Sequence, residues 1–149
     1  MSLSTQVMTA MKEAMKAKDQ NALTSLRAIK SAILLAQTES GSKVDLSEEQ
    51  ELSLLQKLVK QRKDSAAIFT EQGRSDLADP ELEQAAVIAQ FLPEQLGEEE
   101  IAKVIDEVIA ATGASGMKDM GKVMGQVSAK LAGKADGKTI STIVKAKLS

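Results

Sequence analysis

The stretch EEEIAKVIDEVIAATG, residues 98–113, decides the fold class of this chain. Its aliphatic residues recur every three or four positions, which is the spacing of one face of an α-helix. Three glutamates at its start suit the positive end of a helix dipole. Gly113 suits the left-handed residue that ends many helices. We therefore predict a helix whose inner face consists of Ile101, Val104, Ile105, Val108 and Ile109.

Apolar residues at helical spacing mark six further segments, and capping signals bound them. Residues 47–50 form a capping-box pattern. Asn21 and Asp136 are predicted to cap the N-termini of two other helices, while Gly41 and Gly73 are predicted to end helices. A fourth helix starts between residues 75 and 80, where Pro80 is tolerable in a first turn, and runs to 92. Its predicted inward residues are Leu82, Ala85, Ala86, Ile88, Ala89 and Leu92. The remaining predicted helices cover about residues 4–17, 21–40, 47–73, 117–131 and 136–148.

The best domain boundary is the segment LPEQLG, residues 92–97. Pro93 cannot continue a helix, and it biases Leu92 away from helical dihedral angles. The predicted fold class is therefore all-α. We predict an N-terminal four-helix domain over residues 1–92, a hinge over 93–97, and a three-helix C-terminal domain over 98–149.

Composition limits both the core and the chemistry. Of the 149 residues 43% are hydrophobic, but only two are aromatic, so we expect an aliphatic core filled out by methionines. The chain has no cysteine and no histidine, which removes disulfides, thiolate metal sites and the usual acid–base group near neutral pH. We expect no catalytic residue, no metal site and no cofactor.

No apolar run approaches the roughly 18 residues that span a bilayer. The first fifteen residues are amphipathic and charged, which is not typical of a signal peptide. We therefore predict a cytoplasmic protein with no membrane partner.

The net charge of −2 hides an uneven distribution. Residues 93–112 carry one lysine against six acidic residues, whereas residues 113–149 carry seven lysines against two aspartates. The C-terminal third of the chain is thus basic, which favours an anionic partner.

Lysines and glycines alternate in this basic segment. Lys118 and Lys122 share one helix face, as do Gly121 and Gly125. Exposed lysines often serve only solubility, and paired glycines often serve only tight helix packing. The functional interpretation is contact with nucleic-acid phosphates, and its candidate residues are Lys118, Gly121, Lys122, Gly125, Lys130, Gly133, Lys134 and Lys138.

Two near matches to a nucleotide-binding P-loop are rejected. Residues 116–123 lack the Ser or Thr that must follow the lysine, and residues 133–139 have their first glycine one position too close. Neither follows a predicted strand, which the motif requires.

Several motifs together resemble one known family. They are KQRKDS at 60–65, FLPEQL at 91–96, TGA at 112–114, DMGKVMG at 119–125 and GKADG at 133–137. In this order they resemble the YqeY family across essentially the whole chain. That family is similar to the C-terminal region of GatB, the B subunit of the glutamine-dependent tRNA amidotransferase (the GatB/YqeY domain).

The resemblance implies a tRNA-associated binding module without catalysis of its own, because the chain shows no counterpart of the amidotransferase's catalytic regions. Its expected partners are tRNA and, as an alternative, amidotransferase or synthetase subunits. Two other functions stay open: a helical protein–protein adaptor, and an accessory component of a glutamine-dependent amidotransferase, a carbon–nitrogen ligase with glutamine as amido-N-donor.

Overall fold

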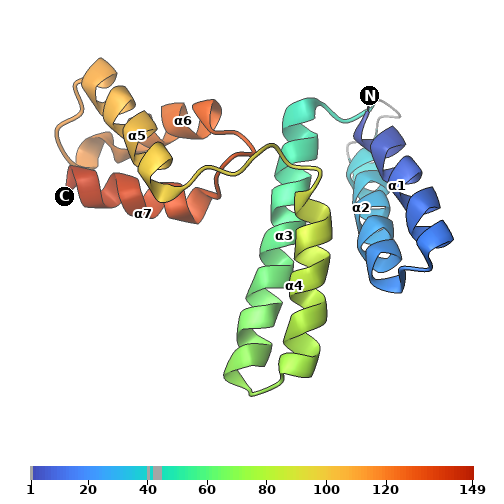
Figure 1. Cartoon of the computed structure of the whole chain (residues 1–149). Coiled ribbons are helices and arrows are strands. Elements are labelled where there is room, and N and C mark those ends of the chain that lie inside the picture. Colours follow the sequence, from blue (N-terminus) through green and yellow to red (C-terminus); the bar gives the residue numbers. More distant parts are fainter. Residues whose placement is uncertain (1, 40, 42–44) are drawn as a thin grey trace. The chain divides into compact units, whose positions relative to one another are not determined.

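The computed structural model describes residues 2–39, 41 and 45–149 (Figure 1). Within these residues the chain forms seven α-helices and one short 3-10 helix, and it forms no strand. The predicted all-α class is confirmed. The chain divides into two compact units, Met1–Leu92 and Pro93–Ser149, each with its own hydrophobic core. The action of residues 93–97 as a hinge between independent domains stays a prediction.

The N-terminal unit consists of two helical hairpins. Its core joins Ile29, Leu55 and Ile88, which are at most 1% exposed and come from three different helices. The long second hairpin stands out in Figure 1 as the green and yellow helix pair. The four helices are α1 (Leu3–Ala17), α2 (Gln20–Glu39), α3 (Glu48–Glu71) and α4 (Ser75–Ala89).

Local signals set several helix ends as predicted. The Ser47 hydroxyl accepts from the Gln50 amide at 3.2 Å, and the Gln50 side chain accepts from the Ser47 amide at 2.9 Å, which completes the capping box. Gly41 and Gly73 adopt the left-handed conformation after α2 and α3, at φ +66° and +71°. The predicted end of the second helix near Ser40 lies outside the described residues.

The predicted cap at Asn21 is wrong. Asp19 caps α2 instead, because its carboxylate accepts from the Ala22 amide at 3.0 Å. Asn21 lies inside the helix and makes side-chain hydrogen bonds to α4, to Glu83 at 2.7 Å and to Gln84 at 3.3 Å. Its polar side chain therefore joins two helices rather than ending one.

The hairpin of α3 and α4 differs from prediction in two ways. Pro80 is the sixth residue of α4 rather than part of its first turn. The expected inward residues Leu82 and Ala86 are exposed, whereas Ala85 and Ile88 of the same helix are buried in the core. Where the hairpin extends towards its tip, Ala66 of α3 and Ala78 of α4 are buried.

The C-terminal unit is a three-helix arrangement with a wholly aliphatic buried core (Figure 1). Its elements are α5 (Glu98–Thr112), the 3-10 helix η1 (Met117–Asp119), α6 (Met120–Lys130) and α7 (Gly137–Leu148). The side chains that are at most 1% exposed are Ile105, Val108, Val123, Val127 and Val144.

Helix ends in this unit lie where the capping signals predict them. The prediction that methionines fill the core is confirmed only in part. Gly113 ends α5 with φ +66°, and the Asp136 carboxylate accepts from the amides of Lys138 and Thr139 at 2.7 and 3.3 Å, as predicted. Met117 lies in η1 rather than in α6 and is exposed. Methionines fill the rim of the two cores at Met11, Met120 and Met124 but are exposed at Met8, Met15 and Met117.

Candidate nucleic-acid interface

The α6 helix has one buried face and one open face. Val123 and Val127 are fully buried in the core of the C-terminal unit. Gly121 and Gly125 are exposed. Because residues four apart share a helix face, the two glycines form one strip of bare backbone. Ser128 continues this strip, and the longer side chains of Lys122 and Gln126 are exposed beside it.

The glycines do not serve packing within the C-terminal unit. A Cβ atom added at Gly121 or Gly125 would meet nothing within 4 Å. The packing interpretation predicts a neighbouring helix against this strip, and the described residues of the C-terminal unit place none there. Two glycines in a short helix cost about 1 kcal/mol each relative to alanine. A contact outside the C-terminal unit remains as a reason for them.

The candidate lysines are all exposed and unpaired. Within the described part of the chain, none of their side chains forms an ion pair or a hydrogen bond. By contrast, Lys147 of α7 is neutralised by Asp106 of α5 at 2.9 Å. The lysines that keep their charge available for a ligand are Lys118 of η1, Lys122 and Lys130 of α6, Lys134 of the following loop and Lys138 of α7.

These lysines form two separate groups rather than a single cluster. Lys118 and Lys122 flank the start of α6, while Lys130, Lys134 and Lys138 surround its end and the start of α7. At the usual helical rise, Lys122 and Lys130 lie about 12 Å apart along the axis. Such an elongated arrangement suits a row of phosphates better than a single bound phosphate.

The loop between α6 and α7 is held by the first residues of the C-terminal unit. The Gln95 side chain donates to the Gly133 carbonyl at 2.7 Å, and the Leu96 amide donates to the Lys134 carbonyl at 2.9 Å. Gly133 is buried, and its φ of +75° favours glycine. Gly133 therefore shapes the loop that carries Lys134, and a direct nucleic-acid contact from Gly133 stays a prediction.

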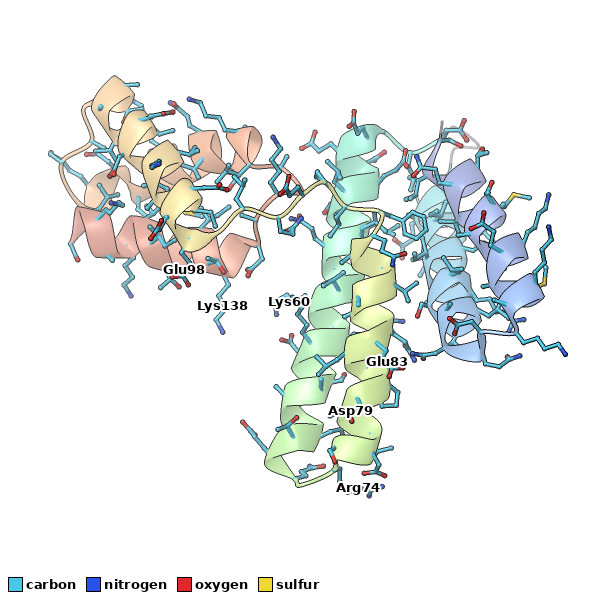
Figure 2. All side chains as sticks on the ribbon, in the orientation of Figure 1. Lys60, Arg74, Asp79, Glu83, Glu98 and Lys138 are labelled. Carbon is cyan, nitrogen blue, oxygen red and sulfur yellow. The ribbon has the colours of Figure 1, made fainter. Side chains whose placement is uncertain are left out.

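Capping fixes the position of the last candidate lysine. Asp136 holds the first turn of α7 through the amides of Lys138 and Thr139 and through the Thr139 hydroxyl at 2.8 Å. The Lys138 side chain projects away from this turn into solvent (Figure 2). The amides of the helix start are thus satisfied internally, and the lysine side chain is what remains for a ligand.

Other chemistry in the described residues is sparse. No group of three or more potential metal ligands gathers in residues 2–39, 41 and 45–149. Arg74 and Asp76 form a two-point ion pair at the tip of the α3–α4 hairpin, with distances of 3.0 and 2.9 Å. The Arg74 guanidinium lowers the pKa of the Asp76 carboxyl, and Asp76 raises the pKa of Arg74. Both side chains are exposed, which indicates a surface pair rather than an active site.

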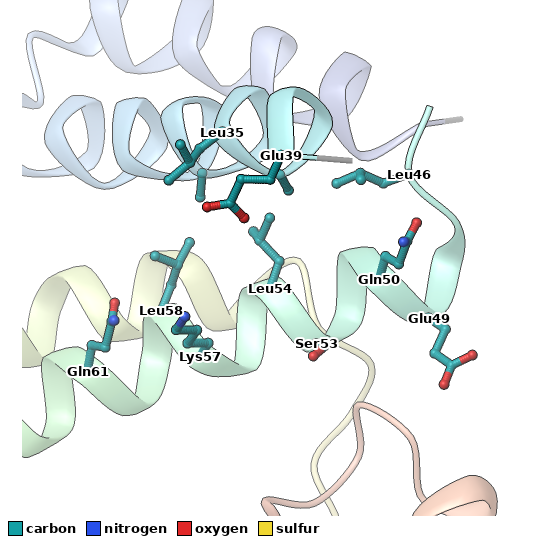
Figure 3. A pocket seen from close by; sticks show the side chains of 12 residues that line it. Leu35, Glu39, Leu46, Glu49, Gln50, Ser53, Leu54, Lys57, Leu58 and Gln61 are labelled. Atoms are coloured by element: carbon teal, nitrogen blue, oxygen red, sulfur yellow. The ribbon is translucent and has the colours of Figure 1, made fainter. Parts of the chain in front are cut away.

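A groove between α2 and α3 is a second surface feature, and it was not predicted from the sequence (Figure 3). Its α2 wall is a second apolar stripe beside the one that enters the core. The signal was present in the sequence as helical spacing of the residues Ala32, Leu35, Ala36 and Glu39.

No helix within the described residues is both long and apolar enough to cross a membrane. The fold and this surface define a class of protein: small, all-helical, with exposed lysines along one helix and its following loop. The chain belongs to the YqeY family, since the family described as Yqey-like protein matches residues 4–148. The predicted resemblance is confirmed.

Two relatives are similar to parts of the chain. A glutamyl-tRNA(Gln) amidotransferase subunit of Thermococcus gammatolerans is 49% identical over 57 residues, which is 36% of this chain and 9% of that protein. Altered inheritance of mitochondria protein 41, mitochondrial, of Clavispora lusitaniae is 37% identical over 83 residues, 55% of this chain and 46% of that protein. The chain thus spans less than half the length of either relative.

Proposed function

We propose that this protein is a tRNA-associated binding module without catalysis of its own, and that the open face of α6 is its contact surface. The observation that carries the proposal is the strip of Gly121 and Gly125, exposed without any neighbour and flanked by Lys118 and Lys122. Bare helix backbone lets a sugar–phosphate chain approach closely, while the lysines neutralise its phosphates.

The side-chain chemistry favours a structured RNA over an unstructured strand. Proteins that bind single strands stack bases on aromatic rings. Both aromatic residues of this chain, Phe69 and Phe91, belong to the N-terminal unit, so the C-terminal unit offers lysines and backbone only. Double-helical RNA is recognised by its shape and by phosphate and 2′-hydroxyl contacts, which need no aromatic residue.

The similarity to a glutamyl-tRNA(Gln) amidotransferase subunit supports tRNA as the RNA. The shared part is 9% of that protein, so its amide-transfer reaction is not assigned to this chain. Stimulation of glutamine-dependent amide transfer by the purified protein would instead favour the accessory amidotransferase component.

The first test is fluorescence anisotropy of the full chain with labelled tRNA over a salt series, with duplex DNA as a control ligand. Reversing the charge of Lys118, Lys122, Lys134 and Lys138 to glutamate should weaken tRNA binding strongly. Each lost phosphate contact should lower the slope of log affinity against log salt by about 0.7–0.9.

The matched control reverses four exposed lysines of the N-terminal unit, namely Lys12, Lys16, Lys30 and Lys63. This variant has the same net charge as the first, so it separates a local contact from general electrostatic attraction. Equal loss of tRNA affinity in both variants would contradict the proposal. No tRNA binding by the wild type even at low salt would also contradict it and would favour the protein–protein adaptor.

Substitution of the two glycines of the strip should change stability and tRNA affinity in opposite directions. Replacing both Gly121 and Gly125 by alanine should raise the free energy of unfolding by about 1 kcal/mol per site, because both positions are open and helical. The same variant should bind tRNA more weakly, since two methyl groups would hold the RNA backbone away. Thermal unfolding and anisotropy measure the two effects on one sample.

The control for this variant is Ser128→Ala, which raises helix propensity on the same face without adding bulk. It should stabilise slightly and leave tRNA affinity unchanged. If the glycine variant were more stable and bound tRNA as well as the wild type, close backbone approach would be ruled out.

A further inference from the structure

The groove between α2 and α3 is a large hollow in the described part of the N-terminal unit, with a volume of about 780 Å³ (Figure 3). Leu35 of α2 and Leu54 and Leu58 of α3 form its apolar walls. Leu35 is 60% exposed, although it lies on a helix whose other face is fully buried. Covering its apolar walls would remove exposed leucine surface from water.

The groove follows from the way α2 and α3 pack. Both helices pack extensively on α4, whereas they touch each other sparsely. One side of the α2–α3 crevice is therefore filled by α4, and the described residues of the N-terminal unit place no helix on the opposite side. A four-helix arrangement would be completed by a second pair of helices on that side.

We propose that this face binds a second copy of the chain, so that α2 and α3 of two subunits form a two-fold symmetric four-helix interface. In a two-fold interface the same patch meets itself and must be self-complementary. A two-fold axis along the groove sets α2 of each copy against α3 of the other. Leu35 then faces the α3 leucines of the partner subunit.

The charges of the groove favour this occupant. Glu39 on the α2 wall and Lys57 on the α3 wall lie at a similar level along the groove (Figure 3). Neither forms an ion pair among the described residues. The same axis brings Glu39 of each copy to Lys57 of the partner subunit. The dimer therefore contains two equivalent intersubunit ion pairs. Nucleic acid does not suit this surface, because Glu39 and Glu49 would repel phosphates.

The test is sedimentation of the full chain, without nucleic acid, from micromolar to millimolar concentration. We expect a reversible monomer–dimer equilibrium. Leu35→Glu should raise the dimer dissociation constant by about a hundredfold, since it leaves an unpaired charge in a desolvated interface. Leu34→Glu is the matched control, because Leu34 is similarly exposed at 55% but does not line the groove.

A charge exchange shows whether the contact is between subunits. Glu39→Lys and Lys57→Glu should each weaken self-association by about three- to tenfold. An equimolar mixture of the two variants should dimerise like the wild type, because both intersubunit pairs then regain opposite charges. A pair within one chain could not be rescued by mixing.

A monomer at every concentration, or equal effects of Leu34→Glu and Leu35→Glu, would overturn the proposal, as would a mixture that fails to recover. Circular dichroism of each variant checks that helix content is kept, and the charge exchange stands even if Leu35→Glu unfolds. Self-association is measured without RNA, so its failure leaves the proposed tRNA contact untouched.

Discussion

Replacing Ile105 by aspartate should unfold the C-terminal unit while the N-terminal unit stays folded. Ile105 is 0% exposed and lies at the centre of a core made only of aliphatic side chains. A buried unpaired carboxylate costs about 3–5 kcal/mol, which is comparable with the whole stability of a domain of this size. No polar group in the buried core could compensate for it.

Hydrogen exchange read by mass spectrometry tests this prediction. Amides of α5, α6 and α7 should lose protection in Ile105→Asp, and amides of α2, α3 and α4 should keep it. Lys103→Asp is the control, because Lys103 is exposed on the same helix. Loss of protection in both units would show that they fold as one cooperative body, contrary to the separate cores.

Leu55→Ala should destabilise the N-terminal unit by about 2–5 kcal/mol. Leu55 is 1% exposed and packs in the core with Ile29 and Ile88. Removal of its three outer carbon atoms leaves a cavity that rigid helices cannot close fully. Urea unfolding followed by circular dichroism measures the loss, which should appear in the transition of the N-terminal unit.

The neighbouring residue provides the contrast. Leu54 is half-buried, lines the groove and packs only on the rim of the core. At concentrations where the chain is monomeric, Leu54→Ala should cost less than about 1 kcal/mol. Equal losses for Leu54→Ala and Leu55→Ala would mean that the groove is closed in solution.

The parts of the fold that could be predicted are those with short-range causes. The Ser47 capping box, the Asp136 cap and the left-handed Gly113 depend on contacts within three or four residues, which the sequence displays directly. Asn21 shows the limit of this reasoning. Both Asp19 and Asn21 can cap a helix, and the long-range bonds to Glu83 and Gln84 decided which one did.

Exposure was harder to predict because it depends on which helices meet. The apolar pattern includes the exposed residues Met8, Leu34 and Leu82 as well as the core residues. Helical spacing does not show how much of an apolar helix face a neighbouring helix covers. Likewise, the spacing of Gly121 and Gly125 placed them on one face of α6 but not on its open side. That distinction required the positions of α5 and α7.

Gln95 and Leu96 fasten the first residues of the C-terminal unit to the loop of Gly133 and Lys134. The segment that connects the two units is therefore anchored to the basic loop before it reaches the start of α5. Tension on the chain from the N-terminal side would reach Lys134 first, before it strained any helix. The hydrogen bonds of Gln95 and Leu96 would therefore carry this load before α5 does.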